Sequence, residues 1–212
     1  MRKLPQFVNG EYYHVYNRGT EKRDLFLDSY DVSRFLKCMQ LFNTITPIGS
    51  LYELSFAKDV TTVVNKPLVN FVAYCLNPNH FHFLLQQKQD CGVSEIMKRL
   101  GAGYAGFFNL KYKRTGALFS GKYKVKHVTD NDYLLHLSAY VNLNDRVHEI
   151  NSPIVRSSWG EYSENPNGFC KTSIVLKQFK SKKDYTTFAL DSLKLMLDRK
   201  AEDKDLSAFL ID

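Results

Sequence analysis

Two apolar segments joined by a short turn constrain the fold of this chain most. Residues 68–76 are almost continuously apolar, Asn77-Pro78-Asn79 supplies turn chemistry, and residues 80–86 form a second apolar segment. We interpret them as two adjacent antiparallel strands. The chain has 212 residues, which is enough for one domain with a substantial core and too few for two large ones.

Strands and helices are predicted to alternate along the rest of the chain. Residues 11–17 and 119–128 alternate polar and apolar side chains, as strands do. Apolar residues at helical spacing favour three helices, with capping residues available at 28–29 and 130–131. The predicted helices cover residues 29–42, 93–111 and 131–143, and further helices are expected near 173–179 and 183–197.

This order of elements predicts an α+β fold in which helices cover an antiparallel sheet. Residues 46–66 contain Pro47, Gly49 and a mixed pattern that fits either an extended hairpin or an insertion. We expect residues 1–150 to form the main domain. Residues 151–212 are expected to be a C-terminal helical extension that packs on the same domain.

Composition limits the classes of protein that fit the chain. Hydrophobic residues make up 44% and charged residues 24%, so a packed fold is expected rather than a disordered chain. The formal net charge of +7 favours a polyanionic partner without proving one. The cysteines form no CxxC pair, so we expect reduced, mostly buried thiols instead of a zinc knuckle or redox motif. No apolar stretch has the length of a signal peptide or membrane span, so we expect a cytoplasmic protein with no membrane partner.

A histidine pair in the second apolar segment is the first candidate for chemistry. His80 and His82 are two residues apart on a predicted strand, so both imidazoles project from one face. Phe81 and Phe83 then point to the opposite face. Two imidazoles placed in this way can share a metal ion. Such pairs also occur as polar strand faces or as hydrogen-bonded residues, and spacing alone does not decide between these roles.

A tyrosine and an asparagine near the end of the predicted helix 131–143 form the second candidate. Tyr140 and Asn144 are four residues apart and share a helix face, where they could be a nucleophile and a third metal ligand. The alternative is a core tyrosine followed by a helix C-cap. If the helix continues, His136 and His148 lie on the same face, and we expect both to be solvated flanking residues.

Four segments, in order along the chain, resemble the REP-associated tyrosine transposases, a branch of the single-tyrosine HUH transposase superfamily. They read YHVYNRG from Tyr13, NPNHFHFLL from Asn77, YAGFFNLKYKRTGALFSG from Tyr104 and YLLHLSAYVNLN from Tyr133. The second segment is the most diagnostic because it is similar to the family's PNHxH segment. The matches cover most of residues 11–148. The resemblance implies a ferredoxin-like HUH nuclease fold, with the catalytic domain in residues 1–150.

The resemblance also implies the roles of individual residues. In that family the two histidines bind a divalent cation, the tyrosine attacks DNA, and a polar residue four positions later completes the metal site. By motif position these are His80, His82, Tyr140 and Asn144, with Mg²⁺ or Mn²⁺ as the implied cofactor. The implied reaction cleaves and rejoins single-stranded, hairpin-associated DNA through a 5′-phosphotyrosine intermediate. The chain departs from the family at Asp145, where proline often follows the asparagine.

The densest group of basic residues marks the expected path of the DNA. Lysines at alternate positions in the predicted strand 119–128 share one face, which suits contacts to backbone phosphates. A solvated strand face would give the same pattern. Lys22 is a secondary candidate. The candidate DNA-binding residues are Arg18, Lys111, Lys113, Arg114, Lys122, Lys124 and Lys126.

Two alternative functions fit the same motifs. A HUH replication initiator or relaxase uses the same chemistry, but such proteins usually carry larger accessory regions than this chain has room for. A non-catalytic DNA-binding protein domesticated from a transposase would use the lysine-rich strand as its platform. The sequence does not decide whether the chain works as a monomer or as a homodimer.

Overall fold

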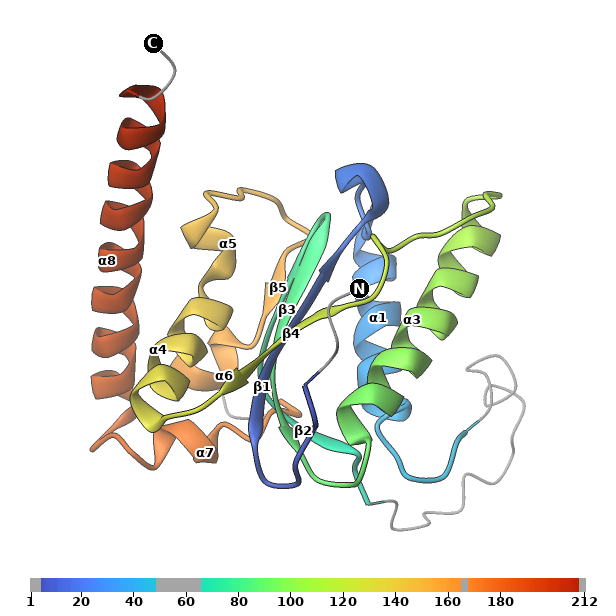
Figure 1. Ribbon diagram of the computed structural model, residues 1–212, viewed down its shortest axis with the longest axis horizontal. Helices are drawn as coiled ribbons and strands as arrows, with labels where there is room; N and C mark the ends of the chain where they lie inside the picture. The colour runs from blue at the N-terminus through green and yellow to red at the C-terminus, as the bar shows by residue number, and fades with distance from the viewer. Residues whose placement is uncertain (1–4, 49–65, 165–167, 210–212) are drawn as a thin grey trace.

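A five-stranded antiparallel sheet forms the centre of the structure (Figure 1). The computed structural model describes residues 5–48, 66–164 and 168–209, with side chains described as far as residue 202. The strand order is β4-β1-β3-β2-β5. The strands are β1 (Tyr12–Arg18), β2 (Val69–Asn77), β3 (His80–Gln87), β4 (Lys124–Val128) and β5 (Arg156–Ser157).

The predicted hairpin is confirmed as β2 and β3, which pair from Asn77 and His80 at the turn outward. Only Asn70, His80 and Gln86 in these two strands are not fully buried. Helices cover both faces of the sheet at this point, which explains why the two segments read as nearly continuous apolar runs.

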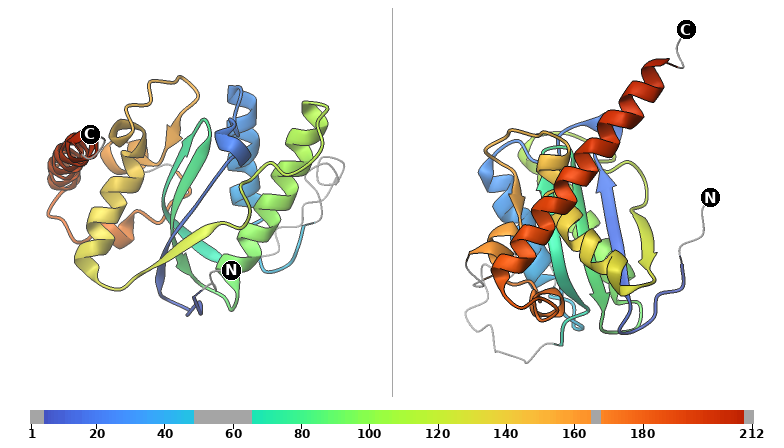
Figure 2. Two further views of the ribbon diagram at one scale, coloured as in Figure 1. Left: turned by 45° about the horizontal axis from the view of Figure 1, so that its top comes forward. Right: turned by 90° about the vertical axis from the view of Figure 1, so that its left-hand side faces the viewer.

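Helices form a layer on each side of the sheet (Figures 1 and 2). The helices α1 and α3 cover one face, and α4, α5, α6 and α8 lie on the other. The order β1, α1, β2, β3, α3, β4 with sheet order β4-β1-β3-β2 is the ferredoxin-like arrangement, so the expected α+β class is confirmed. The helices are α1 (Ser29–Leu41), α3 (Gly92–Lys111), α4 (Asn131–Asn142), α5 (Asn144–Val147), α6 (Trp159–Ser163), α7 (Ser173–Leu176) and α8 (Lys182–Phe209), with a 3₁₀ turn η1 (Thr20–Lys22).

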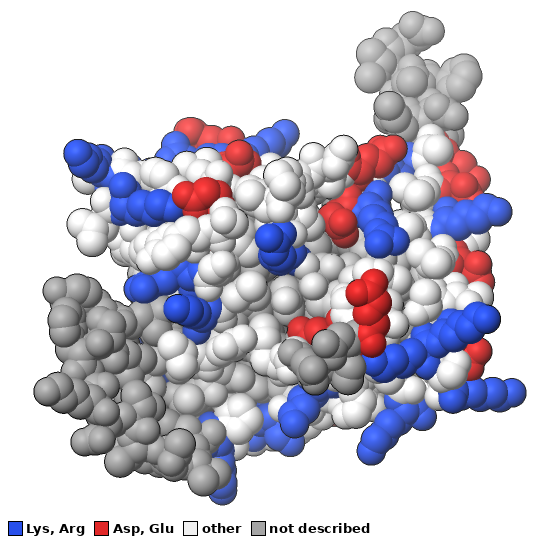
Figure 3. Space-filling model, turned by 180° about the vertical axis from the view of Figure 1, so that it is seen from behind, with Lys and Arg blue, Asp and Glu red and all other residues white. Residues whose placement is uncertain are grey.

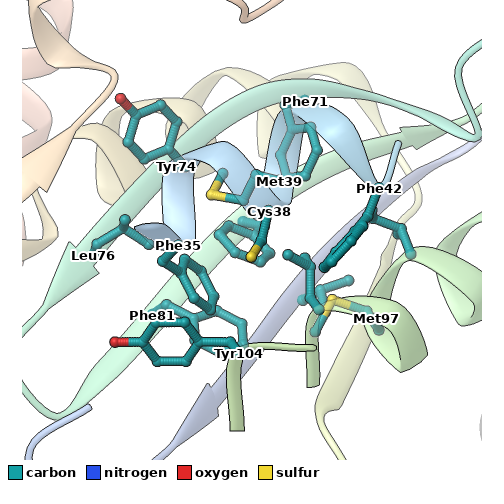
Figure 4. Close-up of a cluster of buried hydrophobic side chains, with 14 of the residues drawn as sticks. Phe35, Cys38, Met39, Phe42, Phe71, Tyr74, Leu76, Phe81, Met97 and Tyr104 are labelled. Atoms are coloured by element: carbon teal, nitrogen blue, oxygen red, sulfur yellow. The ribbon is translucent and has the colours of Figure 1, made fainter. Parts of the chain in front are cut away.

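A hydrophobic core fills the space between the sheet and the helices α1 and α3. Phe35 of α1 lies against Phe81 of β3 and Tyr104 of α3, with ring centroids 5.6 and 4.8 Å away (Figure 4). All three side chains are at most 2% exposed. Aromatic pairs of this geometry add to the free energy gained from burial. This core fixes β3 from the face opposite to its histidines.

A buried polar network joins α4 to α8 and to the sheet on the other face. Asn142 Nδ2 donates a hydrogen bond to the Tyr185 hydroxyl at 2.8 Å, and Ser138 Oγ lies 3.1 Å from that hydroxyl. Ser158 Oγ donates to Asn142 Oδ1 at 2.6 Å and accepts from the Tyr74 backbone N–H at 2.9 Å. Because buried polar groups are costly when unpaired, this network specifies how α4 sits on the sheet.

The predicted strand 119–128 begins later than expected, at Lys124. Gly121 has a φ of 71°, in the left-handed region, which interrupts strand geometry. The residues before it continue the pairing of β1 instead: the Ser120 backbone N–H donates to the Arg18 carbonyl at 2.8 Å, and Phe119 forms an isolated bridge with Gly19. The strand prediction is therefore wrong for residues 119–123.

The predicted helix 131–143 ends at Asn142, and a new short helix, α5, begins at Asn144. Asp130 is the N-cap, since its side chain accepts a hydrogen bond from the Tyr133 backbone N–H. Leu143 has a φ of −113° and breaks the helix. Positions 136, 140, 144 and 148 therefore do not share one continuous helix face. The Asn144 side chain is fully buried after the break.

Other boundaries differ in smaller ways. The predicted helix 173–179 is shorter, as α7, and the predicted helix 183–197 is longer, as α8. Residues after 150 also supply β5, which the sequence did not indicate. Most of residues 46–66 lie outside the described residues. The four cysteines are free, but Cys91 is exposed and Cys170 only partly buried, so the expectation of mostly buried thiols holds for Cys38 and Cys75.

Within the described part of the chain, no helix combines the length and the hydropathy needed to cross a bilayer.

Candidate active site

Pairing of β1 with β3 brings aromatic side chains together on the face covered by α4. Tyr16 lies directly opposite His82 in the sheet, and their rings stack with centroids 5.4 Å apart. The His14 ring lies next to both, with its centroid 5.1 Å from that of His82 and 4.9 Å from that of Tyr16. Tyr140 of α4 completes the group, with its ring centroid 5.6 Å from that of His82 and 6.0 Å from that of His14. The structure thus places the predicted nucleophile beside one predicted metal ligand.

His80 joins this group from the start of β3. Its ring centroid lies 5.3 Å from that of His82, in an edge-to-face arrangement. Asn144 Oδ1 is 3.2 Å from His80 Nε2. Asn77 Nδ2 contacts both atoms, at 2.7 Å from Asn144 Oδ1 and 2.9 Å from His80 Nε2. All four residues that the sequence analysis selected for catalysis and metal binding therefore lie together.

Burial keeps the site histidines neutral. Desolvation lowers the pKa of His80, an effect partly offset by Asn144 Oδ1, which would accept a hydrogen bond from the protonated ring. Its Nδ1 lies 2.6 Å from Asn79 Oδ1 and must carry the proton, because a carbonyl oxygen can only accept. Its Nε2 therefore presents a lone pair toward Asn144 and Asn77.

His82 is paired with a second histidine. Its Nδ1 lies 2.8 Å from His14 Nε2. Desolvation, with repulsion from neighbouring histidines, holds the pKa of His82 well below 6.5. Desolvation and nearby Lys126 lower the pKa of His14 to about 4. With both rings neutral, one nitrogen of this pair donates and the other accepts. If His82 Nδ1 is the donor, its Nε2 is free to bind a cation.

The donor atoms fit a divalent cation. His80 Nε2 and Asn144 Oδ1 are two acceptors that converge on a shared position, and the Asn77 amide nitrogen provides the donor between them. His80 is oriented through its other nitrogen by Asn79, as metal-binding histidines usually are. Among the described residues no set of three or more His, Cys, Asp or Glu side chains could hold a metal ion. The amide oxygen of Asn144, 3.2 Å from His80 Nε2, is the neutral donor placed to be a third protein ligand.

Tyr140 is protonated at neutral pH. Desolvation raises the pKa of its hydroxyl above 10, and hydrogen bonding to Asn144 only partly offsets this effect. A protonated phenol is a poor nucleophile, so attack on phosphorus requires positive charge close to the oxygen. The position next to His82 and Asn144 is where such a charge would be held.

Two site residues were missed by the sequence analysis. His14 and Tyr16 share one face of β1 by their spacing, but the contact of His14 with His82 follows from the register of β1 against β3, which the sequence does not reveal. Asn77 was interpreted only as a turn residue. Its side chain is fully buried and bonds to two predicted ligands. A buried turn asparagine next to a His-x-His pair is the signal that could have indicated it.

The two flanking histidines have different environments. His148 is exposed, as expected, but its ring centroid is 5.6 Å from that of His80. His136 is also exposed, although its Nδ1 lies 3.1 Å from Ser192 Oγ and its ring centroid 4.9 Å from that of Phe188, both on α8. The expectation of solvated side chains is therefore confirmed for both histidines, and His136 in addition contributes to the α4–α8 contact.

Several of the predicted basic residues border the site. Lys124 and Lys126 lie directly opposite Tyr16 and His14 in the sheet, and both are exposed. Arg18, Lys22 and Lys124 line a cavity of about 350 Å³ together with His80 and His148. On the back of the molecule, by contrast, basic and acidic side chains are interspersed (Figure 3). Positive charge is thus concentrated where His80 is accessible.

The other basic candidates lie elsewhere. Lys111 Nζ is bonded to Asp28 and Asp31, each at 2.7 Å, which leaves it little capacity to bind phosphate. Arg114 Nη1 donates a hydrogen bond to Asn109 Oδ1 of α3 at 2.5 Å. Lys113 and Lys122 are exposed, but neither lines the cavity that contains His80.

A ferredoxin-like sheet that presents two histidines from a central strand to a tyrosine on a covering helix is the layout that the resemblance in the sequence implies. Two comparisons with known proteins bear on it. Residues 52–144 match the family model described as "Transposase IS200 like". No curated protein sequence matches the chain.

The fold is also similar to a solved structure of a REP-associated tyrosine transposase bound to a REP hairpin. The match has a TM-score of 0.50 and 10% sequence identity, and covers 81% of this chain and 89% of that chain. At this identity the likeness concerns the fold. Together with the family model it confirms the resemblance that the sequence indicates.

The low pKa of His14 predicts a loss of stability in acid. The folded protein keeps this ring neutral down to about pH 4, whereas the unfolded chain protonates it near 6.5. Between these values the unfolded state binds more protons, so the free energy of unfolding falls as the pH falls, by up to about 3 kcal/mol. Urea unfolding of the metal-free protein across this pH range measures the change.

His14→Gln removes the titrating group, so its free energy of unfolding should fall less steeply with decreasing pH. His127→Gln is the matched control, because His127 is on the surface with its side chain 39% exposed. Equal slopes for the wild type and His14→Gln would contradict the assignment.

Proposed function

We propose that this chain is a metal-dependent, single-tyrosine DNA endonuclease and strand transferase that acts on single-stranded DNA next to a hairpin. The observation that carries the proposal is the grouping of Tyr140 with His80, His82 and Asn144, drawn from a central strand and a facing helix. The match to a transposase family model and the fold of a hairpin-bound transposase support it.

His80, His82 and Asn144 would hold a Mg²⁺ or Mn²⁺ ion. Imidazole and carboxamide are borderline ligands, which suit Mn²⁺ well and accept Mg²⁺ when water completes its shell. When bound, such an ion supplies positive charge that polarises the scissile phosphate and stabilises the charge of the transition state. Asn79 and His14 would keep the two imidazoles in the required tautomers.

Tyr140 performs the attack in this proposal. Its hydroxyl oxygen forms a bond to phosphorus while the bond from phosphorus to the 3′-oxygen breaks, and the phenolic proton ends on the released 3′-hydroxyl. The product is a 5′-phosphotyrosine. The new ester conserves the energy of the broken one, so attack by a 3′-hydroxyl can rejoin DNA without ATP. Tyr16 and His82 stack at the site and limit the positions open to Tyr140.

Replacing the nucleophile tests this role directly. Wild-type protein incubated with a labelled hairpin oligonucleotide and Mn²⁺ should form a covalent protein–DNA adduct that survives denaturing electrophoresis. Tyr140→Phe should reduce the adduct by at least about a thousandfold, because it removes the hydroxyl oxygen through which the protein would bond to phosphorus.

Tyr133→Phe is the matched control, since it makes the same substitution on the same helix and should keep full activity. An adduct that persists in Tyr140→Phe would contradict the nucleophile assignment. Tight DNA binding with no adduct from the wild type, unaffected by a chelator, would instead support a non-catalytic DNA-binding protein.

The basic residues give a second prediction, about DNA affinity. Lys124→Ala or Lys126→Ala should weaken binding of the oligonucleotide and reduce the slope of log K against log salt by about one each. Lys111→Ala should leave affinity nearly unchanged, because this lysine is held by Asp28 and Asp31. Fluorescence anisotropy over a salt series measures both quantities. A larger loss from Lys111→Ala than from Lys124→Ala would contradict the assigned DNA path.

A further inference from the structure

A second cavity lies on the opposite face of the sheet, beneath the loop that leads into β4. It has a volume of about 370 Å³, within the range of small-ligand pockets. Its floor is the buried core, where Phe35, Phe81 and Met97 lie close together (Figure 4). Phe119 and Tyr123 form a wall that is only partly buried. None of these residues has a role in the chemistry proposed for Tyr140.

The two cavities are neighbours in the fold. Asn17, near the end of β1, lines both of them. Its Nδ2 donates a hydrogen bond to the Gly121 carbonyl at 3.2 Å, which holds the loop in place. Ser120 faces the cavity that contains His80, whereas Gly121 and Lys122 face the apolar one. A DNA strand that leaves the active site past Ser120 and Gly121 would meet the apolar cavity next.

The chemistry of the cavity selects its occupant. Exposed Lys122 and Lys98 contribute to its lining; Lys98 lies 3.7 Å from Glu95 but its side chain is 77% exposed, so the entrance favours an anionic chain mainly through Lys122. Its interior is apolar and aromatic, which suits a flat, uncharged ring. Ser94 and Tyr123, whose hydroxyls are 3.5 Å apart, add polar groups that can contact a ring edge. A nucleotide has this combination of a charged backbone and a planar base.

We propose that this cavity binds one unpaired nucleobase of the single strand that passes through the active site. The inference rests on the proposed function and adds to it a position at which the enzyme selects its cleavage site. Bases stacked on aromatic side chains bind regardless of sequence, and the hydroxyls of Ser94 and Tyr123 would supply a preference among them. Phosphates on either side of the base would lie near Lys122 and Lys98.

Two glycines of α3 provide a matched pair of variants. Gly101 lines the cavity, and a Cβ built there meets no described atom within 4 Å, so a leucine side chain would occupy the space of the base. Gly106 lies on the same helix, is exposed, and has equally open surroundings. Replacing either glycine raises helix propensity, so both variants should fold. Phe119→Leu is a second variant, which removes the aromatic wall and keeps it apolar.

The experiment measures binding alone, in Tyr140→Phe protein, to a hairpin with single-stranded flanks in which each flanking base in turn is replaced by an abasic site. We expect one abasic position to weaken binding about tenfold, and Gly101→Leu and Phe119→Leu to cause a similar loss on the intact strand. On the strand that lacks this base, Gly101→Leu should cause no further loss. Gly106→Leu should bind like its parent throughout.

Two results would overturn the base pocket and leave the proposed function intact. One is tight binding whose affinity changes equally at every abasic position. The other is a loss of affinity in Gly101→Leu that is the same on all strands. If the parent protein bound no single-stranded flank at all, the proposed function would fail and this inference with it.

Discussion

The pairing of β1 with β3 is the interaction on which the candidate site depends. It places Tyr16 opposite His82 and sets His14 within hydrogen-bond distance of the same imidazole. A shift of this register by one residue would turn His14 and Tyr16 to the other face of the sheet. The register is fixed by the opposite face, where Tyr13 and Val15 are buried in the core that includes Phe81 and Phe83. The hydrophobic face thus determines the geometry of the polar one.

The second constraint is the position of α4 over that polar face. Tyr185 of α8 bonds to Asn142 and lies 3.1 Å from Ser138, so the C-terminal helix holds α4 through groups that have no access to water. The helix break at Leu143 then lets two different helices position Tyr140 and Asn144. Tyr140 remains on α4 above His82, while Asn144 begins α5 and meets His80. An uninterrupted helix would not have this freedom to place the two side chains separately.

Sequence patterns predict the elements whose apolar pattern follows directly from burial, on both faces of a central strand or on one face of a helix. The β2–β3 hairpin, α1 and α3 are of this kind, and their boundaries agree with the sequence within a residue or two. The four catalytic candidates were also found, but through resemblance to a family rather than through spacing, since His-x-His and Tyr-x-x-x-Asn are common patterns. Long-range contacts were not predictable. The late start of β4 depends on a positive φ at Gly121, and the ion pairs of Lys111 depend on Asp28 and Asp31, about eighty residues earlier in the chain.

The central claim is that two strand imidazoles bind a metal ion beside Tyr140. Pulsed electron paramagnetic resonance of bound Mn²⁺ tests it most directly, because imidazole nitrogens that bind the ion give resolvable hyperfine couplings. The wild type and Tyr140→Phe should show couplings from two imidazoles, and His80→Ala and His82→Ala should each show one. His136→Ala, whose ring contacts Ser192 and Phe188 of α8, should be unchanged. The claim would be contradicted if both single variants, His80→Ala and His82→Ala, still showed couplings from two imidazoles. It would also be contradicted if the folded wild type bound no Mn²⁺.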